Sequence, residues 1–166
     1  AMTATFNKTQ ATIGAGTTVV QAQDINILAT ALQNRDAAFV KTMSAEAVSG
    51  ASGGEVAVAG ALAVVGNDNE TTAAIDEGAT IGSAASRVGD ITVKAEDTSK
   101  ISAQARAGAL STGDKSKAGV GASFAVLLSN NQSLAAIGRD TDAPDSASAI
   151  HARSATVKAA KNRVEF

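Results

Sequence analysis

Apolar and polar residues alternate with a period of two along much of the chain, which is the pattern of β-strands. In the run 101–108, Ile and Ala at odd positions alternate with polar residues or glycine at even positions, and the run 91–94 alternates in the same way. Helices need apolar residues three and four positions apart, and the many Gly and β-branched residues also argue against them. The pattern therefore predicts an all-β chain of short strands, separated by turns that contain Gly, Asn, Asp and Ser.

One stretch near the middle, 56–64, alternates between larger apolar residues and alanines. We expect the larger side chains to form the core, so that Val58 and the later residues Val120 and Phe124 point inward. The opposite face carries neither charge nor bulk, and we expect it to be covered, either by the segment 140–148 or by lateral self-association with another copy. That strip comprises Ala57, Ala59, Ala61 and Ala63, together with Gly119, Gly121, Ser123 and Ala125.

A 62-residue internal repeat is the strongest signal in the sequence, and Asn7, Asn69 and Asn131 mark its register. Each of these residues begins a similar segment, and the same step maps the run 58–65 onto 120–127. The repeat predicts a chain built of stacked similar units, whose nearest partners are the neighbouring repeats.

The step is locally uneven. Residues 23–27 match 89–93 at an offset of 66, and a similar segment, 154–157, follows 64 residues after the second. Compensating length changes restore the step of 62, which maps Val48 onto Leu110. Such changes are expected in loops between fixed strands.

A unit of 62 residues is longer than one ordinary coil of a β-solenoid, so we expect three coils of about 21 residues, each advancing about 4.8 Å. Val58 and Val120 would then lie about 14 Å apart along the axis. The alternative is a β-sandwich with an internal duplication, for which an aromatic core is expected. The chain has four Phe and no Trp or Tyr, which favours the parallel β-solenoid.

The repeat also predicts the organisation of the chain. Residues 1–2 resemble a cloning remnant, and residues 3–166 form one fragment of about two and a half repeats. Because the chain begins and ends partway through a repeat, we expect a piece of a longer array.

Composition excludes several classes of function. The net charge is −2, which leaves no basic face for nucleic acid and no basic cluster for an anionic membrane. The sequence contains no run of 18 apolar residues, so it does not predict a membrane-spanning helix. It contains no cysteine, which excludes a disulfide, a thiolate metal site and a cysteine nucleophile.

Two groups of residues contain side chains that could form a functional site. The acidic loop 140–145 offers carboxylates to Ca²⁺, but it lacks the order of a calcium loop, so an exposed turn is expected. His151 lies near Ser146 and Asp145, yet no nucleophile elbow is present, and a single histidine cannot form a two-histidine metal site.

Asparagine-rich and glycine-rich segments are interpreted as structural. The segments 67–69 and 129–131 recur at equivalent positions, and asparagine is typical of turns. Asn7, Asn69 and Asn131 also begin Asn-x-Ser/Thr sequences, which leaves glycosylation open. The segments Gly14-Ala15-Gly16 and Gly119-Val120-Gly121 lack the third glycine of a dinucleotide-binding turn, so we expect tight packing there.

Two segments carry a family resemblance. The run 119–126, followed by Asn130-Asn131 and by 135–138, and the run 89–97 resemble repeats of very large exported bacterial proteins. These are the filamentous-haemagglutinin-like adhesins and the repetitive leukotoxin type. The resemblance implies a right-handed parallel β-helix, a secreted or cell-surface location, and a structural or adhesive role. The insertion around Asp140 to Ser148 departs from this pattern.

We therefore expect a structural and adhesive segment that acts as an elongated scaffold or stalk, with no catalytic, cofactor-binding or metal-binding residues. A module that binds a glycan or a host protein is the alternative. A polysaccharide-acting β-helix enzyme is the third class, but such an enzyme needs clustered carboxylates, usually with aromatic platforms for the sugar.

Overall fold

The computed structural model describes residues 1–32, 43–53, 56–111, 118–139 and 148–165. Within these ranges all regular secondary structure is β, as predicted, and no helix is long and apolar enough to cross a membrane. In chain order the strands are β1 (Met2–Ile13), β2 (Thr18–Val19), β3 (Ile25–Leu32), β4 (Met43–Gly53), β5 (Val56–Asp76), β6 (Thr80–Ile81), β7 (Val88–Ser111), β8 (Ala118–Arg139), β9 (Ala149–Ile150) and β10 (Ala152–Glu165).

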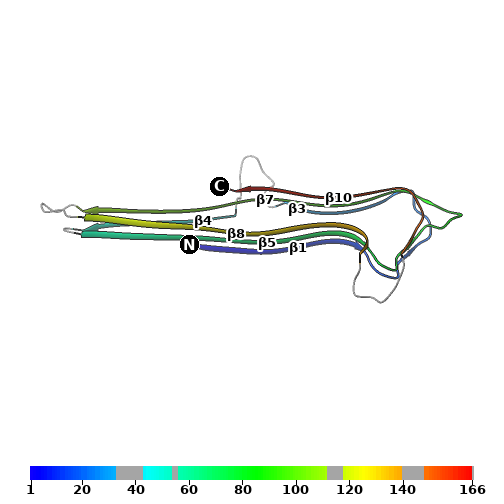
Figure 1. The fold of residues 1–166 in the computed structure, drawn as a ribbon, viewed down its shortest axis with the longest axis horizontal. Helices are drawn as coiled ribbons and strands as arrows, with labels where there is room; N and C mark the ends of the chain where they lie inside the picture. The colour runs from blue at the N-terminus through cyan, green and yellow to red at the C-terminus, as the bar shows by residue number, and fades with distance from the viewer. Residues whose placement is uncertain (33–42, 54–55, 112–117, 140–147, 166) are drawn as a thin grey trace.

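The strands form three sheets, and every pairing between described strands is parallel. One long sheet has the order β1-β5-β8, the other has the order β10-β7-β3 with β4 also paired to β7, and a short sheet has the order β2-β6-β9. Figure 1 shows the two long sheets as extended layers, joined at one end by the short strands. The parallel pairing does not fit a sandwich of antiparallel sheets.

Each 62-residue repeat makes a single circuit around these three sheets. Strand β5 runs along one layer, β6 crosses the end, and β7 returns along the other layer (Figure 1). Val58 is the direct strand partner of Val120, so the expected division into three coils is wrong. The reason is strand length: β5 has 21 residues and β7 has 24, against a usual five or six. Two such strands use most of one repeat.

The register confirms the repeat and its local slips. Asn7 pairs with Asn69, which pairs with Asn131, and Ile25 pairs with Ile91 at the expected offset of 66. Residue 48 behaves differently from the prediction, because Val48 pairs with Arg106 and not with Leu110.

Four length differences account for the slips. Between β2 and β3 the first repeat has four fewer residues than the second has between β6 and β7, and the third has five fewer between β9 and β10. Leu32 pairs with Thr98 and Met43 with Ile101, so the first repeat has eight more residues than the second between these positions. The third repeat has the insertion predicted near 140–148, since Ile137 pairs with Ile75 but Ala149 pairs with Thr80.

The faces of β5 and β8 are the reverse of the expectation. Val58 and Phe124 are 68% and 67% exposed, and Val120 is exposed as well, whereas the strip of alanines from Ala57 to Ala63 is buried. That strip is covered within the chain by the strands of the opposite layer, where Ala45 and Ile101 pack beside Ala63. Lateral packing through Ala57 to Ala63 is therefore wrong, whereas the β8 members of the strip, Gly119, Gly121, Ser123 and Ala125, are exposed.

The small interior residues reflect how closely the two layers approach. A Cβ on Gly119 would lie 2.7 Å from the carbonyl oxygen of Ala109, and one on Gly121 would lie 2.9 Å from that of Ala107. Stacked sheets are usually about 10 Å apart, which leaves room for large side chains. Where Gly119 and Gly121 face Ala109 and Ala107, backbone meets backbone, so only small side chains fit between the layers.

The interior is bulkier near the short sheet. The buried cluster there contains aliphatic residues from all three sheets, and it is the larger of the two apolar clusters in the described residues. Its largest fully buried members are Ile75, Ile81, Val88, Ile91 and Val93. Between this cluster and the alanine section lies an interior section of polar side chains.

Candidate functional site

The polar interior section is the first candidate site, because its side chains are buried between the two layers. Strand alternation places these side chains inward, since they continue the odd-numbered face of β5 and β7 and the equivalent face of β8. The buried members are Asn67, Asn69, Thr71, Asp97, Ser99 and Asn131. The segments 67–69 and 129–131 were expected to be turns, and that expectation is wrong because both lie inside long strands.

Amide side chains connect the three repeats within this section. The Nδ2 of Asn7 donates to the Oδ1 of Asn69 at 3.1 Å, and the Nδ2 of Asn67 donates to the Oδ1 of Asn131 at 2.9 Å. Across the two layers, the Nδ2 of Asn131 donates to the Oγ of Ser99 at 2.6 Å. These bonds satisfy buried polar groups and join neighbouring repeats, as ladders of asparagine do in stacked parallel strands.

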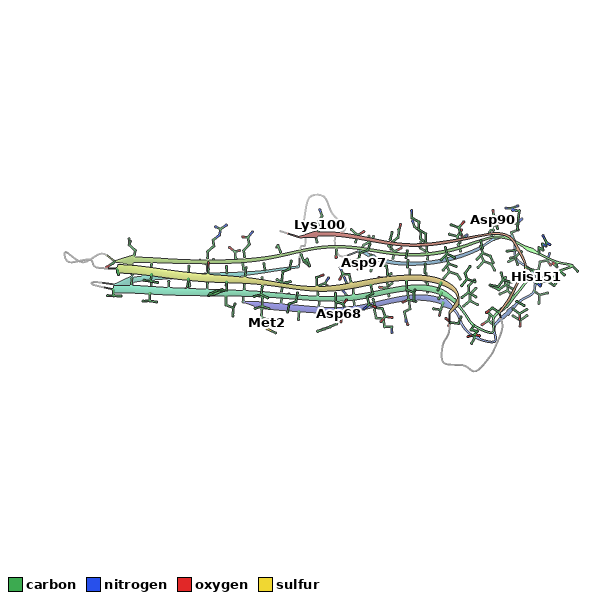
Figure 2. The ribbon with its side chains drawn as sticks, viewed as in Figure 1. Met2, Asp68, Asp90, Asp97, Lys100 and His151 are labelled. Carbon is green, nitrogen blue, oxygen red and sulfur yellow. The ribbon has the colours of Figure 1, made fainter. Side chains whose placement is uncertain are left out.

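Asp97 is the one charged residue among the buried side chains of this section, at 1% exposure. Burial raises the pKa of its carboxyl group, and the Asn69 amide and the Lys161 ammonium oppose this rise in part. Lys161 is the strand partner of Asp97 in the third repeat, and its Nζ donates to the carbonyl oxygen of Asn131 at 2.9 Å. Figure 2 shows Asp97 between the two layers.

The section thus contains amides, hydroxyls and one carboxylate, and hydrogen bonds join the asparagine side chains to one another and to Ser99. Within the described ranges no group of three or more His, Cys, Asp or Glu side chains is arranged to hold a metal ion. What this arrangement does chemically is to fix which residue of one repeat faces which residue of the next.

A second polar cluster lies at the corner where β7 and β10 begin. Arg153 binds Asp90 through two hydrogen bonds, from Nε at 2.9 Å and from Nη2 at 2.5 Å, and the Oγ of Ser154 donates to the same carboxylate at 2.8 Å. These bonds lower the pKa of Asp90 to about 2, with the Arg153 hydrogen bond as the main cause. The backbone N–H of Asp90 donates in turn to the Oδ1 of Asp24 at 2.8 Å. The cluster therefore links three successive repeats.

His151 lies between β9 and β10, at the end of the molecule where the short strands join the two layers (Figure 2). Its backbone N–H donates to the carbonyl oxygen of Ile81, and its own carbonyl oxygen accepts from Val88. Asp145 and Ser146, like the whole acidic loop 140–145, lie outside the described residues.

The three Asn-x-Ser/Thr sequences differ in accessibility. Asn7 is exposed, whereas Asn69 and Asn131 are buried in the polar interior section. A glycan on either buried amide would not fit between the layers, because Asn69 and Asn131 are only 1% and 6% exposed. The sequence signal for this burial was strand alternation, because Asn67 and Asn69 lie at odd-numbered positions, on the same face of the strand as Ala57.

The two Gly-x-Gly segments have different roles. Gly119 and Gly121 lie in β8, where the opposite layer leaves no room for a side chain, as tight packing predicts. Gly14 and Gly16 lie in the turn between β1 and β2, and nothing lies within 4 Å of a Cβ at either position. Tight packing is therefore wrong for this pair, and Gly16 instead has a φ of 73°, which glycine adopts readily.

The outer surfaces of the two long layers differ in chemistry. On β7 the outward positions are mostly polar or charged, and they include Lys94, Glu96 and Lys100. On the outer surface of β1-β5-β8, large apolar side chains such as Leu62 and Phe124 are exposed. A shallow hollow over Gly66 lies on that surface.

Compared with models of protein families, with curated proteins and with solved structures, the chain matches none of them.

Proposed function

We propose that this chain is a structural segment of a right-handed parallel β-solenoid, in which each 62-residue repeat contributes one coil. The observation that carries the proposal is the register: Asn7, Asn69 and Asn131 are direct strand partners in three successive repeats. A chain that pairs only with its own neighbouring repeats is extended by adding repeats, which is how a scaffold or stalk is built.

Bonds between repeats support the same proposal. The polar interior section and the Asp90 corner each join one repeat to the next through side chains. In a site that acts on a substrate, convergent polar groups are expected to face a pocket. Here the polar groups form hydrogen bonds with groups of the neighbouring repeat, and these bonds stabilise the stacking of the repeats.

The proposed setting follows the family resemblance. Repeats of the filamentous-haemagglutinin-like type and the repetitive leukotoxin type belong to large exported bacterial proteins, so we propose a secreted or cell-surface scaffold that is not an enzyme. A module that binds a glycan or a host protein is the second candidate, and the exposed apolar surface of β1-β5-β8 is the observation that favours it.

Deletion of one whole repeat tests the scaffold. Removal of residues 64–125 joins Ala63 to Val126, which occupies the same position of the circuit as Val64. The shortened chain should fold, with the far-ultraviolet circular dichroism of β-structure and a cooperative urea transition at lower concentration. A control deletion of residues 64–94 removes half a circuit and should prevent folding.

Two results would count against the proposal. If the 62-residue deletion fails to fold, or if both deletions fold equally well, stacking by repeat does not hold the chain together. Binding is tested separately with a glycan array and with host-cell extracellular proteins. Specific saturable binding that survives the 62-residue deletion would favour the ligand-binding module over a plain scaffold.

A further inference from the structure

The outer surface of the β1-β5-β8 sheet carries a broad group of exposed apolar side chains, which we call the apolar outer face. It extends over all three strands, and its largest members point away from the interior. The members that the argument uses are Phe6, Val58, Leu62, Val120, Phe124 and Leu128, and each is more than half exposed.

Register makes these side chains adjacent. Val58 pairs with Val120, and Leu62 pairs with Phe124, so the apolar residues stand side by side across the strands. From 56 to 67 and from 118 to 129 the sequence contains no charged residue, and the first charge on β5 is Asp68. The opposite layer also exposes large apolar side chains, such as Leu28 and Val48, but these pair with Lys94 and Arg106. The surface of β1-β5-β8 therefore differs in having a continuous apolar section without charge.

From these observations we infer that the apolar outer face is a lateral interface that packs against the same face of a second copy of this chain. A second copy is the partner whose surface is equally flat and equally free of charge. Its strands also repeat at the same spacing of about 4.8 Å, so rows of side chains on two such faces match over any number of coils. This inference rests on the sheet geometry and does not depend on the proposed function.

The area of the face sets how strong the association should be. Ten residue steps of about 3.3 Å along two to three strands about 4.8 Å apart give a flat area of about 400 Å². That reaches the largest apolar patches on ordinary monomers, about 300–600 Å², but a stable interface buries about 800 Å² on each partner. The chain should therefore associate weakly, and each added coil should add about 160 Å² and strengthen the association.

Charges at the centre of the face test the inference directly. The double variant Leu62→Lys with Phe124→Glu places an opposite-charge pair on adjacent strands, which the sheet tolerates on a solvated surface. Sedimentation equilibrium of the unaltered chain should give an average mass that rises with protein concentration. The double variant should remain a monomer while keeping the circular dichroism and the urea midpoint of the unaltered chain. Gln104→Lys, on the opposite layer beside Glu46, should associate like the unaltered chain.

Crosslinking gives a second test, because the chain has no cysteine of its own. Under mild oxidation Leu62→Cys should form covalent dimers, whereas Gln104→Cys should remain monomeric. Dimers from both variants, or from neither, would contradict a specific contact through the apolar outer face.

Other outcomes identify other partners and would overturn the inference. A monomer at every concentration that floats with phosphatidylcholine vesicles, and loses this binding in the double variant, would mean that the face binds lipid. Association that the double variant retains would mean that copies join through other surfaces, such as the edges of the sheets. A monomer that binds no vesicles would mean that the face is covered by neither a second copy nor a lipid surface.

Discussion

The contact between Gly89 and the preceding repeat offers a sharp test of how the repeats are stacked. A Cβ at position 89 would overlap the carbonyl oxygen of Gln23 and the carboxylate of Asp24, and would lie 2.9 Å from the carbonyl carbon of Gln23. Most of these atoms belong to the backbone, which cannot rotate away as a side chain can. Gly89→Ala therefore forces the first repeat away from the second at this corner.

The expected cost follows from the overlap. Forcing an extra carbon into a packed site costs about 1–3 kcal/mol, and backbone neighbours favour the upper end of that range. The hydrogen bond from the Asp90 N–H to the Oδ1 of Asp24 is strained at the same time. Replacement of glycine by alanine also restricts the unfolded chain, which returns about 0.4–1 kcal/mol. The free energy of unfolding should fall by about 2 kcal/mol, a large part of the 5–15 kcal/mol of an ordinary domain.

Urea denaturation followed by circular dichroism measures this change against a matched control. Gly108→Ala lies in the same strand, β7, where nothing is within 4 Å of the added carbon. The control should melt at the same urea concentration as the unaltered chain or slightly above it, while Gly89→Ala should melt well below. Equal midpoints for the two variants would show that the repeats are not in contact at Gln23, and the stacking described here would be wrong.

Three further predictions concern single side chains. Asp97→Asn should raise the free energy of unfolding at pH 7, because burial raises the pKa of Asp97 above 3.8 and makes ionisation of the folded carboxyl group unfavourable. The gain in stability over the unaltered chain should shrink as the pH falls to 3.8, and urea melts at both pH values measure it. Ala59→Lys should cost about 3–5 kcal/mol in a urea melt because it buries an unpaired charge, whereas Val58→Lys on the exposed face should change the stability by about 0.5 kcal/mol or less; similar losses for both would show that the faces are misassigned. In an NMR titration Asp90 should have a pKa of about 2, and Arg153→Gln should move it toward 3.8; an unchanged value would mean that the ion pair does not form in solution.

Charged residues explain why the inward face can be read from the sequence on β7 and not on β5 and β8. On β7 the polar and charged residues Lys94 and Arg106 mark the outside, so Ile91 and Ile101 could be placed inside, and both are buried. On β5 and β8 neither face carries a charge between 56 and 67, and side-chain size was the only guide. Size was misleading because the layers approach too closely for large side chains in the section from Ala57 to Ala63. That distance depends on the opposite sheet, and no local sequence pattern contains it.

The expected coil length was wrong because it assumed strands of ordinary length, whereas β5 and β7 have 21 and 24 residues. The repeat itself was readable from identities such as those at Asn69 and Asn131, and the strand pairing confirms it. Asparagine is typical of turns, however, so turns were expected at 67–69 and 129–131, where β5 and β8 in fact continue. The polar interior section was missed for the same reason, although the parity of Asn67 and Asn69 was present in the sequence. The hydrogen bond that joins Asn131 to Ser99 depends on the second layer and could not be predicted from local sequence.

The single wide circuit has a mechanical consequence. Each coil advances the molecule by only about 4.8 Å along the stacking direction, yet its 62 residues span about 200 Å when fully extended. Tension applied along the stack would open one coil at a time, and each opening would lengthen the chain about fortyfold relative to the height that the coil had occupied. A long array of such coils would be short and stiff at low force. Above the force that unfolds one coil, its extension would increase in equal steps while the remaining coils stayed folded.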